Sequence, residues 1–241
     1  MLIYNVNNIW SITFTSFKKI CKIKNMIEAF VFDMDGILLD TESVCDRTWQ
    51  IAGKEFGVSE EDSLKIVNLC RGTNKSDTRD IIRRELGESF DVEGFLKRTT
   101  ECFVEIEKKE GIRVMPYARE CLQFLKNSGY RLALASSTRE VIVKKHLQAA
   151  ELLDFFEVIV TGDMVVHSKP DPEIYLKACS EIGIQPANCV AVEDSPNGLK
   201  SASLAGMVTV MIPDRISPNE ETEKVTDYLF DSLNGIILAR W

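Results

Sequence analysis

The sequence is short of basic residues. Against 37 aspartates and glutamates stand 29 lysines and arginines, and the formal net charge is −8. A protein that binds nucleic acid needs a basic surface for the phosphate backbone, so this balance argues against nucleic acid as the main partner. A small anionic substrate remains compatible with the charge if a few local cations and a metal ion receive it.

Long apolar runs are also missing. No run approaches the length of a transmembrane helix, so we expect no membrane-spanning segment and no membrane partner. The first 25 residues contain no acid and carry four lysines after an apolar stretch, whereas a secretory signal places its charge first. We therefore predict that residues 1–25 are an extension outside a core that starts at Met26, in preference to an amphipathic membrane anchor.

Paired cysteine motifs are absent. The seven cysteines form no Cys-x-x-Cys pair, and their number is odd. Most of them fall in apolar stretches, which is typical of buried, reduced thiols. Reduced thiols fit a reducing compartment, so we expect a cytoplasmic protein. Internal repeats and low-complexity linkers are absent as well, and 45% of the residues are apolar, enough for a substantial core.

Five short apolar runs have the pattern of buried strands. They are residues 28–33, 131–136, 157–162, 189–194 and 207–213. Helical patterns lie between these runs, and several of them are followed by a glycine that would end the helix. Strands that alternate with helices indicate an α/β fold, a Rossmann-like core with a parallel sheet and right-handed crossovers.

The segment from about residue 41 to residue 111 breaks this alternation. It contains helical patterns, such as the shared apolar face of Val44, Ile51 and Phe56, and no convincing strand. We predict an all-helical insert at 41–111 between the first strand and the rest of the sheet. The core would then consist of residues 26–40 and 112–241.

Polar residues follow four of the predicted strands. They are Asp33 and Asp35 after the first run, Ser136 and Ser137 after the second, Lys169 after the third, and Glu193 and Asp194 at the end of the fourth. Each of these alone is usually a turn residue, a helix cap or a solvated charge. Open parallel sheets bind ligands at the carboxyl ends of their strands, so their shared position favours one active-site crevice.

The chemistry of this set favours phosphoryl transfer. Carboxylates that lie close together repel one another, so they share protons or bind a cation, and a set of hard oxygen ligands suits magnesium. Asp33 could attack phosphorus and form an aspartyl-phosphate. Asp35 could protonate the leaving oxygen and then deprotonate water. Mg²⁺, Lys169 and Ser136 would neutralise the oxygens of the transferring group.

The residues above resemble the haloacid dehalogenase superfamily of phosphohydrolases over about residues 27–233. The resemblance is carried by DMDGILLDTE at 33–42, Ser136, Lys169-Pro170, and EDSPNG at 193–198. It implies that Asp33 is the nucleophile and Asp35 the acid/base. The dehalogenases of the superfamily lack the second aspartate, because a halide leaves without a proton, so Asp35 argues for phosphate chemistry.

The resemblance also implies a ligand set. Asp33, the main-chain carbonyl of Asp35 and Asp194 would bind Mg²⁺ with support from Glu193. Ser136, the backbone of Ser137 and Lys169 would hold the phosphate. A second set of candidates lies in the predicted insert, where Arg71 and Lys75 would contact phosphate or sugar; a solvated helix face explains these two nearly as well.

The insert looks like the helical cap of the branch that includes beta-phosphoglucomutase, phosphoglycolate phosphatase and sugar-phosphate phosphatases. We predict a magnesium-dependent phosphatase of a small phosphorylated metabolite, a sugar phosphate or a nucleotide-like compound, that is a monomer or a weak homodimer. A sugar phosphomutase is the alternative, and a protein that only senses a phosphorylated ligand is the third. In beta-phosphoglucomutase a cap-hinge histidine helps to activate the acid/base, and its place falls at or near Cys45, a weak hydrogen-bond partner, which favours the hydrolase.

Overall fold

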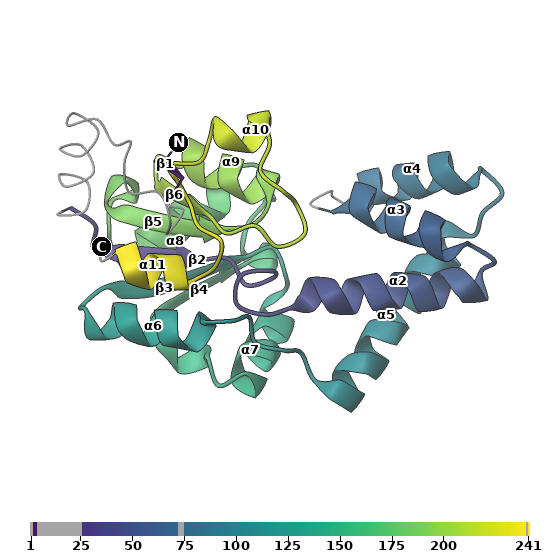
Figure 1. Ribbon diagram of the computed structural model, residues 1–241, viewed down its shortest axis with the longest axis horizontal. Coiled ribbons are helices and arrows are strands. Elements are labelled where there is room, and N and C mark those ends of the chain that lie inside the picture. Colours follow the sequence, from purple (N-terminus) through teal and green to yellow (C-terminus); the bar gives the residue numbers. More distant parts are fainter. Residues whose placement is uncertain (1, 4–25, 72–74, 240) are drawn as a thin grey trace. The chain divides into compact units, whose positions relative to one another are not determined.

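The computed structural model describes residues 2–3, 26–71, 75–239 and 241. The chain divides into two compact units, one made of Met1–Leu39 with Val114–Trp241 and the other of Asp40–Arg113 (Figure 1). The second unit contains the whole of the predicted insert.

A parallel sheet forms the centre of the first unit. Its order in the described part of the chain is β1-β7-β6-β5-β2-β3-β4, and every neighbouring pair is parallel. The strands are β1 (Leu2–Ile3), β2 (Ala29–Phe32), β3 (Arg131–Ser136), β4 (Val158–Thr161), β5 (Cys189–Glu193), β6 (Val208–Met211) and β7 (Tyr228–Leu229). All five predicted strands are present, and the α/β fold with a parallel sheet is confirmed.

The two strands at one edge, β1 and β7, were not predicted. Each is two residues long, too short for a run of apolar residues to indicate it. Leu2 and Ile3 were expected to lie outside the core, but they pair in parallel with Tyr228 and Leu229. The rest of the predicted extension, residues 4–25, lies outside the described residues.

Helices cover both faces of this sheet. They are α6 (Ala118–Asn127), α7 (Glu140–Ala149), α8 (Glu173–Ile182), α9 (Pro196–Leu204), α10 (Glu220–Glu223) and α11 (Asn234–Ala239), with short 3-10 turns at Leu153–Phe155, Gly162–Met164 and Pro186–Asn188. In Figure 1, α8 and α9 lie on one side of the sheet and α6 and α11 on the other. The strands therefore lie between two layers of helices. Because all of them are parallel, their carboxyl ends lie at the same end of the sheet.

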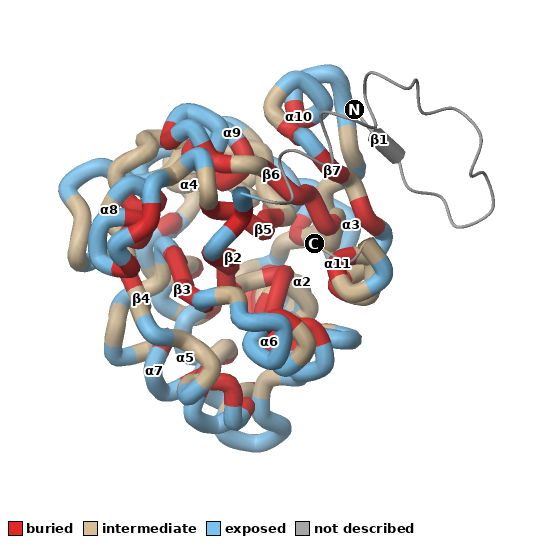
Figure 2. The backbone as a smooth tube through the Cα atoms, turned by 90° about the vertical axis from the view of Figure 1, so that its left-hand side faces the viewer, coloured by how far each residue is buried: buried red, intermediate tan, exposed pale blue. Residues whose placement is uncertain are grey.

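The alternation of side chains along β2 explains the two apolar layers. Ala29 and Val31 point to one face, where they join the core formed with α8 and α9. Phe30 points to the other face, where its ring meets Tyr130 and Trp241 edge-on at 5.2 Å and 5.5 Å between centroids. Because both faces are covered, the central strands read as unbroken apolar runs, and β2 and β5 are buried along their whole length (Figure 2).

The second unit is all helical in its described residues. Its helices are α2 (Thr41–Glu55), α3 (Glu60–Cys70), α4 (Lys75–Leu86) and α5 (Val92–Glu110). The side chain of Asp40 caps α2 by accepting a bond from the backbone nitrogen of Ser43 at 3.2 Å. Trp49 and Phe95 pack edge-to-face at 5.1 Å in a core that is separate from the sheet.

Crossing a membrane requires a long apolar helix. None of the helices in the described ranges combines the necessary length and apolar character.

Candidate active site

The first motif begins where β2 ends. Asp33 follows the strand directly and is buried, and Asp35 lies two residues further on, before Gly36. Gly36 has a φ of +75°, and a Cβ atom built there would lie 2.4 Å from the Oδ2 atom of Asp194. Only glycine accepts both the conformation and the close approach. The motif's glycine thus lets the loop after β2 lie against the carboxylate that follows β5.

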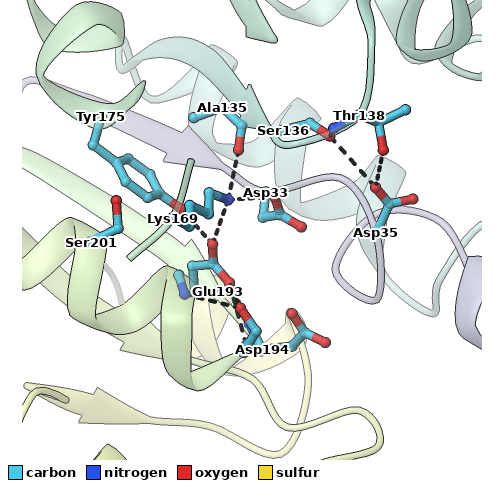
Figure 3. Close-up of polar contacts among 12 residues, drawn as sticks. Asp33, Asp35, Ala135, Ser136, Thr138, Lys169, Tyr175, Glu193, Asp194 and Ser201 are labelled. Carbon is cyan, nitrogen blue, oxygen red and sulfur yellow. Dashed lines mark hydrogen bonds and ion pairs between the residues drawn. The ribbon is translucent and has the colours of Figure 1, made fainter. Parts of the chain in front are cut away.

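Lys169 links three of the strands at the carboxyl end of the sheet. Its Nζ atom donates to Oδ1 of Asp33 at 2.7 Å, to Oε1 of Glu193 at 2.6 Å and to the main-chain oxygen of Ala135 at 2.9 Å. An ammonium group has three N–H donors, so all of them are used. Figure 3 shows these contacts converging on the lysine nitrogen between the strand ends.

Glu193 is surrounded by donors. Its Oε1 atom accepts from Lys169 and from the hydroxyl of Tyr175, the latter at 2.8 Å. Its Oε2 atom accepts from the hydroxyl of Ser195 at 3.0 Å and from the backbone nitrogens of Asp194 and Ser195 at 3.2 Å and 3.3 Å. Five hydrogen bonds leave this fully buried carboxylate little capacity for a further ligand, so its geometry suits holding Lys169 in place.

Asp35 meets the hydroxyl groups that follow β3. Its Oδ2 atom accepts from Oγ1 of Thr138 at 2.9 Å, and Oγ of Ser136 lies 3.5 Å from the same oxygen. The backbone nitrogen of Thr138 donates in turn to Oγ of Ser136 at 3.1 Å. Ser136 is fully buried, whereas Ser137 between them is exposed. The structure therefore brings Asp35 together with the hydroxyl groups of Ser136 and Thr138.

Burial and crowding shift the acidities of the site. The pKa of Asp33 is raised to about 8, because burial and the neighbouring carboxylates of Glu193 and Asp35 together outweigh the lowering by Lys169. Burial and the neighbouring carboxylates of Glu193 and Asp33 hold the pKa of Asp194 well above its usual range. Burial would lower the pKa of Lys169, but Asp33 and Glu193 outweigh it and raise this pKa. Three carboxylates thus face one ammonium, an excess of buried negative charge.

That excess is what a divalent cation would neutralise. Asp33, Glu193 and Asp194 each offer an oxygen, and the three atoms lie within 4.8 Å of one another. The donors are all oxygen, the ligand that Mg²⁺ prefers. Because Glu193 already accepts five hydrogen bonds, Asp33 and Asp194 are the two carboxylates of this group that best fit direct ligation. The residues present fit a magnesium ion.

The two candidates in the insert belong to the second unit. Arg71 forms ion pairs with Glu42 and Asp46, and its Nε atom donates to Oδ1 of Asn68 at 3.0 Å. Only 7% of its side chain is exposed, so the alternative of a solvated helix face does not fit Arg71. Lys75 is the first residue of α4, and its side chain lies outside the described residues.

Two further residues of the site were not predicted. Thr138 is the third member of a hydroxyl cluster after β3, Ser136-Ser137-Thr138, so the cluster itself was the signal that could have identified it. Tyr175 lies inside α8 and is fully buried, with the Lys169 nitrogen 5.0 Å from the centre of its ring. An aromatic residue within an amphipathic helix normally indicates only a core position, so the sequence carries no signal for its bond to Glu193.

The chain is similar to known proteins in sequence and in fold. Residues 27–206 match the family model described as haloacid dehalogenase-like hydrolase. The chain is 34% identical over 194 residues to YhcW, a candidate phosphatase of Bacillus subtilis, covering 80% of this chain and 86% of YhcW. It is 34% identical over 185 residues to the phosphorylated carbohydrates phosphatase of Thermotoga maritima, covering 75% and 82%. A solved structure of a candidate beta-phosphoglucomutase from Thermotoga maritima is similar with a TM-score of 0.73 and 28% identity, covering 88% and 98%.

Proposed function

The chain belongs to the haloacid dehalogenase-like hydrolase family, and we propose that it is a magnesium-dependent phosphatase of a small phosphorylated metabolite, foremost a sugar phosphate. One observation carries the proposal. Asp33 and Asp35 lie two residues apart at the carboxyl end of the sheet. Asp33 is hydrogen-bonded to Lys169, and Asp35 is hydrogen-bonded to Thr138. A nucleophile and an acid/base side by side are what cleavage of a phosphate ester requires.

In the first half of the reaction the carboxylate of Asp33 attacks phosphorus. An Asp33 oxygen–phosphorus bond forms, the bond from phosphorus to the ester oxygen breaks, and Asp35 gives its proton to that oxygen. In the second half Asp35 takes a proton from water, and the water oxygen attacks the aspartyl-phosphate. Inorganic phosphate leaves and Asp33 is restored as a carboxylate.

The surrounding residues would neutralise and orient the phosphoryl group. The ammonium of Lys169 and the hydroxyl of Ser136 supply positive charge and a hydrogen bond, with the backbone of Ser137 as a further donor. Asp33, Asp194 and the main-chain carbonyl of Asp35 would hold Mg²⁺, with Glu193 in support through Lys169. When bound, the ion supplies Lewis-acid neutralisation of the phosphate oxygens. Arg71 and Lys75 remain proposed contacts from the helical unit.

The substrate class is inferred from the relatives. One of them, from Thermotoga maritima, is named a phosphatase of phosphorylated carbohydrates. The net charge of −8 also disfavours a polyanionic partner. A sugar phosphate therefore ranks above a nucleotide-like metabolite.

A panel of phosphometabolites, assayed for phosphate release with Mg²⁺ and with EDTA, tests the proposal. We expect release from one or more sugar phosphates with Mg²⁺ and none with EDTA. Asp33→Asn is the control that excludes a contaminating phosphatase. Release of no phosphate from any panel member by the folded, Mg²⁺-supplied protein would refute the proposal.

A phosphomutase is the second candidate, favoured by the similarity to a candidate beta-phosphoglucomutase. The test supplies beta-glucose 1-phosphate with a trace of the 1,6-bisphosphate and follows glucose 6-phosphate and free phosphate together. A hydrolase releases phosphate at least as fast as it isomerises the sugar. Isomerisation faster by orders of magnitude would establish the mutase and remove the argument drawn from Cys45.

A further inference from the structure

We propose that Thr138 is the positioning residue for the acid/base Asp35, an inference that rests on the proposed phosphatase function. Its Oγ1 atom donates to Oδ2 of Asp35 at 2.9 Å. This is the shorter of two hydroxyl contacts to that oxygen, since Oγ of Ser136 lies 3.5 Å away. Figure 3 shows both hydroxyls aimed at the same side of the Asp35 carboxylate.

Thr138 itself is fixed by backbone bonds to two strands. Its nitrogen donates to Oγ of Ser136 at the end of β3, at 3.1 Å, and its carbonyl oxygen accepts from the nitrogen of Gly162 just after β4, also at 3.1 Å. A Cβ atom built at Gly162 would lie 2.1 Å from the carbonyl oxygen of Ser137, so the two turns lie in close contact. The hydroxyl of Thr138 is thus presented from a rigid turn, and the carboxylate that it holds lies on a loop.

This bond distinguishes the two oxygens of Asp35. Because Oδ2 accepts the hydroxyl proton of Thr138, the proton of the acid form belongs on Oδ1. In the first half-reaction the Oδ1–H bond breaks while the leaving oxygen gains that proton. In the second half Oδ1 takes a proton from the attacking water. Thr138 keeps its own proton throughout and acts only by orienting the carboxyl group, which makes it a positioning residue.

Two substrates separate this role from a structural one. Sugar phosphates have a poor leaving group that needs a proton, whereas p-nitrophenyl phosphate has a good leaving group that needs little protonation. The variants are Thr138→Val, which removes the hydroxyl and keeps the shape, and Thr138→Ser, which keeps the hydroxyl. Thr100→Val is the matched control, an exposed threonine of α5 whose hydroxyl donates to the main-chain oxygen of Leu96.

We expect Thr138→Val to lower kcat on the best sugar phosphate about 10- to 100-fold with little change in KM, a part of the ~10²–10⁴-fold that acid/base catalysis contributes. On p-nitrophenyl phosphate the same variant should stay within about 3-fold of the wild type, since protonation contributes little there. Thr138→Ser should recover most of the sugar phosphatase activity, and Thr100→Val should match the wild type on both substrates.

Equal losses of activity on the two substrates would overturn the positioning role. A raised KM with unchanged kcat would also overturn it, because that result would make Thr138 a substrate contact. Equal activities of the valine and serine variants would overturn it as well. If Thr138→Val lowers the melting temperature, Thr138→Ala is assayed in its place with the same expected pattern. A wild type that hydrolyses neither substrate refutes the proposed function and this role with it, whereas an active wild type with the wrong variant pattern refutes the role alone.

Discussion

The ammonium of Lys169 and the carboxylate of Glu193 form an ion pair of 2.6 Å that is almost closed to solvent, with 7% and 1% of the two side chains exposed. The same ammonium bonds Asp33 at 2.7 Å. One lysine therefore compensates two buried carboxylates. Loss of the ammonium and loss of a carboxylate should therefore have opposite effects on stability. The site already holds an excess of negative charge, which the first change increases and the second reduces.

Lys169→Met should be strongly destabilising in the absence of metal. It leaves Asp33 and Glu193 buried without their cation, and loss of one partner of a buried pair costs about 3–5 kcal/mol. Lys177→Met is the matched control, since Lys177 pairs at 3.0 Å with Glu181 on an accessible face of α8. That variant should change the free energy of unfolding by less than ~1 kcal/mol. Chemical denaturation in EDTA measures both, and equal losses would contradict the account.

Tyr175→Phe tests the support beneath Glu193. The substitution keeps the buried ring and removes only the hydroxyl that donates to Oε1 at 2.8 Å. A hydrogen bond to a charged group contributes about 1.5–3 kcal/mol, so we expect a loss of stability in that range and a lower kcat as Lys169 loses its fixed position. Tyr117→Phe, at a position 47% exposed, should stay within ~0.5 kcal/mol of the wild type. An effect no larger than that of this control would exclude the supporting role.

The metal prediction concerns Asp194. Activity should require Mg²⁺ and disappear with chelator, and Ca²⁺ should inhibit, because it prefers more ligands and a looser shell than in-line attack allows. Asp194→Ala should raise the Mg²⁺ concentration for half-maximal activity at least ~10-fold, the scale on which metal-site residues act. Its melting temperature without metal should fall little or rise, since the loss of this half-buried carboxylate relieves the repulsion among the three neighbouring carboxylates. Undiminished turnover in EDTA would contradict the magnesium site.

The helical unit offers a pH prediction at Asp40. Burial would raise the pKa of Asp40, but its hydrogen bonds from Ser43 and the Arg113 guanidinium outweigh it and hold the pKa below its ordinary value. A lowered pKa in the folded state means that ionised Asp40 stabilises the fold above the unfolded pKa, and that this contribution is lost as the pH falls through the folded value.

Asp40→Asn should therefore lower the free energy of unfolding at pH 7 by about 0.5–1 kcal/mol, since the amide still caps α2. The difference from the wild type should shrink as the pH is lowered toward ~3. Asp231→Asn, at an exposed position, is the matched control and should leave the free energy of unfolding within ~0.5 kcal/mol of the wild type. Denaturation at several pH values measures the effect. A difference independent of pH would mean that the charge of Asp40 does not matter.

Sequence reasoning located the sheet and the candidate site residues that follow its strands, because both leave local signals in the sequence. Buried parallel strands read as apolar runs, and the residues after them were polar at four strand ends, including Asp33, Lys169 and Asp194. Tyr175 left no signal, since its function depends on which side of α8 faces Glu193, a property of packing. The edge strands β1 and β7 were missed for the related reason that two residues carry no periodicity.

The helical unit shows a second limit of prediction from the sequence. Arg71 was recognisable as a cation but not as the partner of Glu42 and Asp46, because ion pairs between residues far apart in the sequence depend on tertiary arrangement. Thr138 lies between these cases. Its cluster was visible, while the choice of Thr138 over Ser137 depended on which hydroxyl the turn directs toward Asp35.

The central claim is that Asp33 is the nucleophile that carries the phosphoryl group. The direct measurement is mass spectrometry of protein quenched in acid during turnover of its best substrate, with digestion to assign the modified peptide. The account predicts one added phosphoryl group on the peptide that contains Asp33, and neither that adduct nor turnover in Asp33→Asn with an unchanged circular dichroism spectrum. A phosphoryl group on a different residue, or full turnover by folded Asp33→Asn, would contradict it.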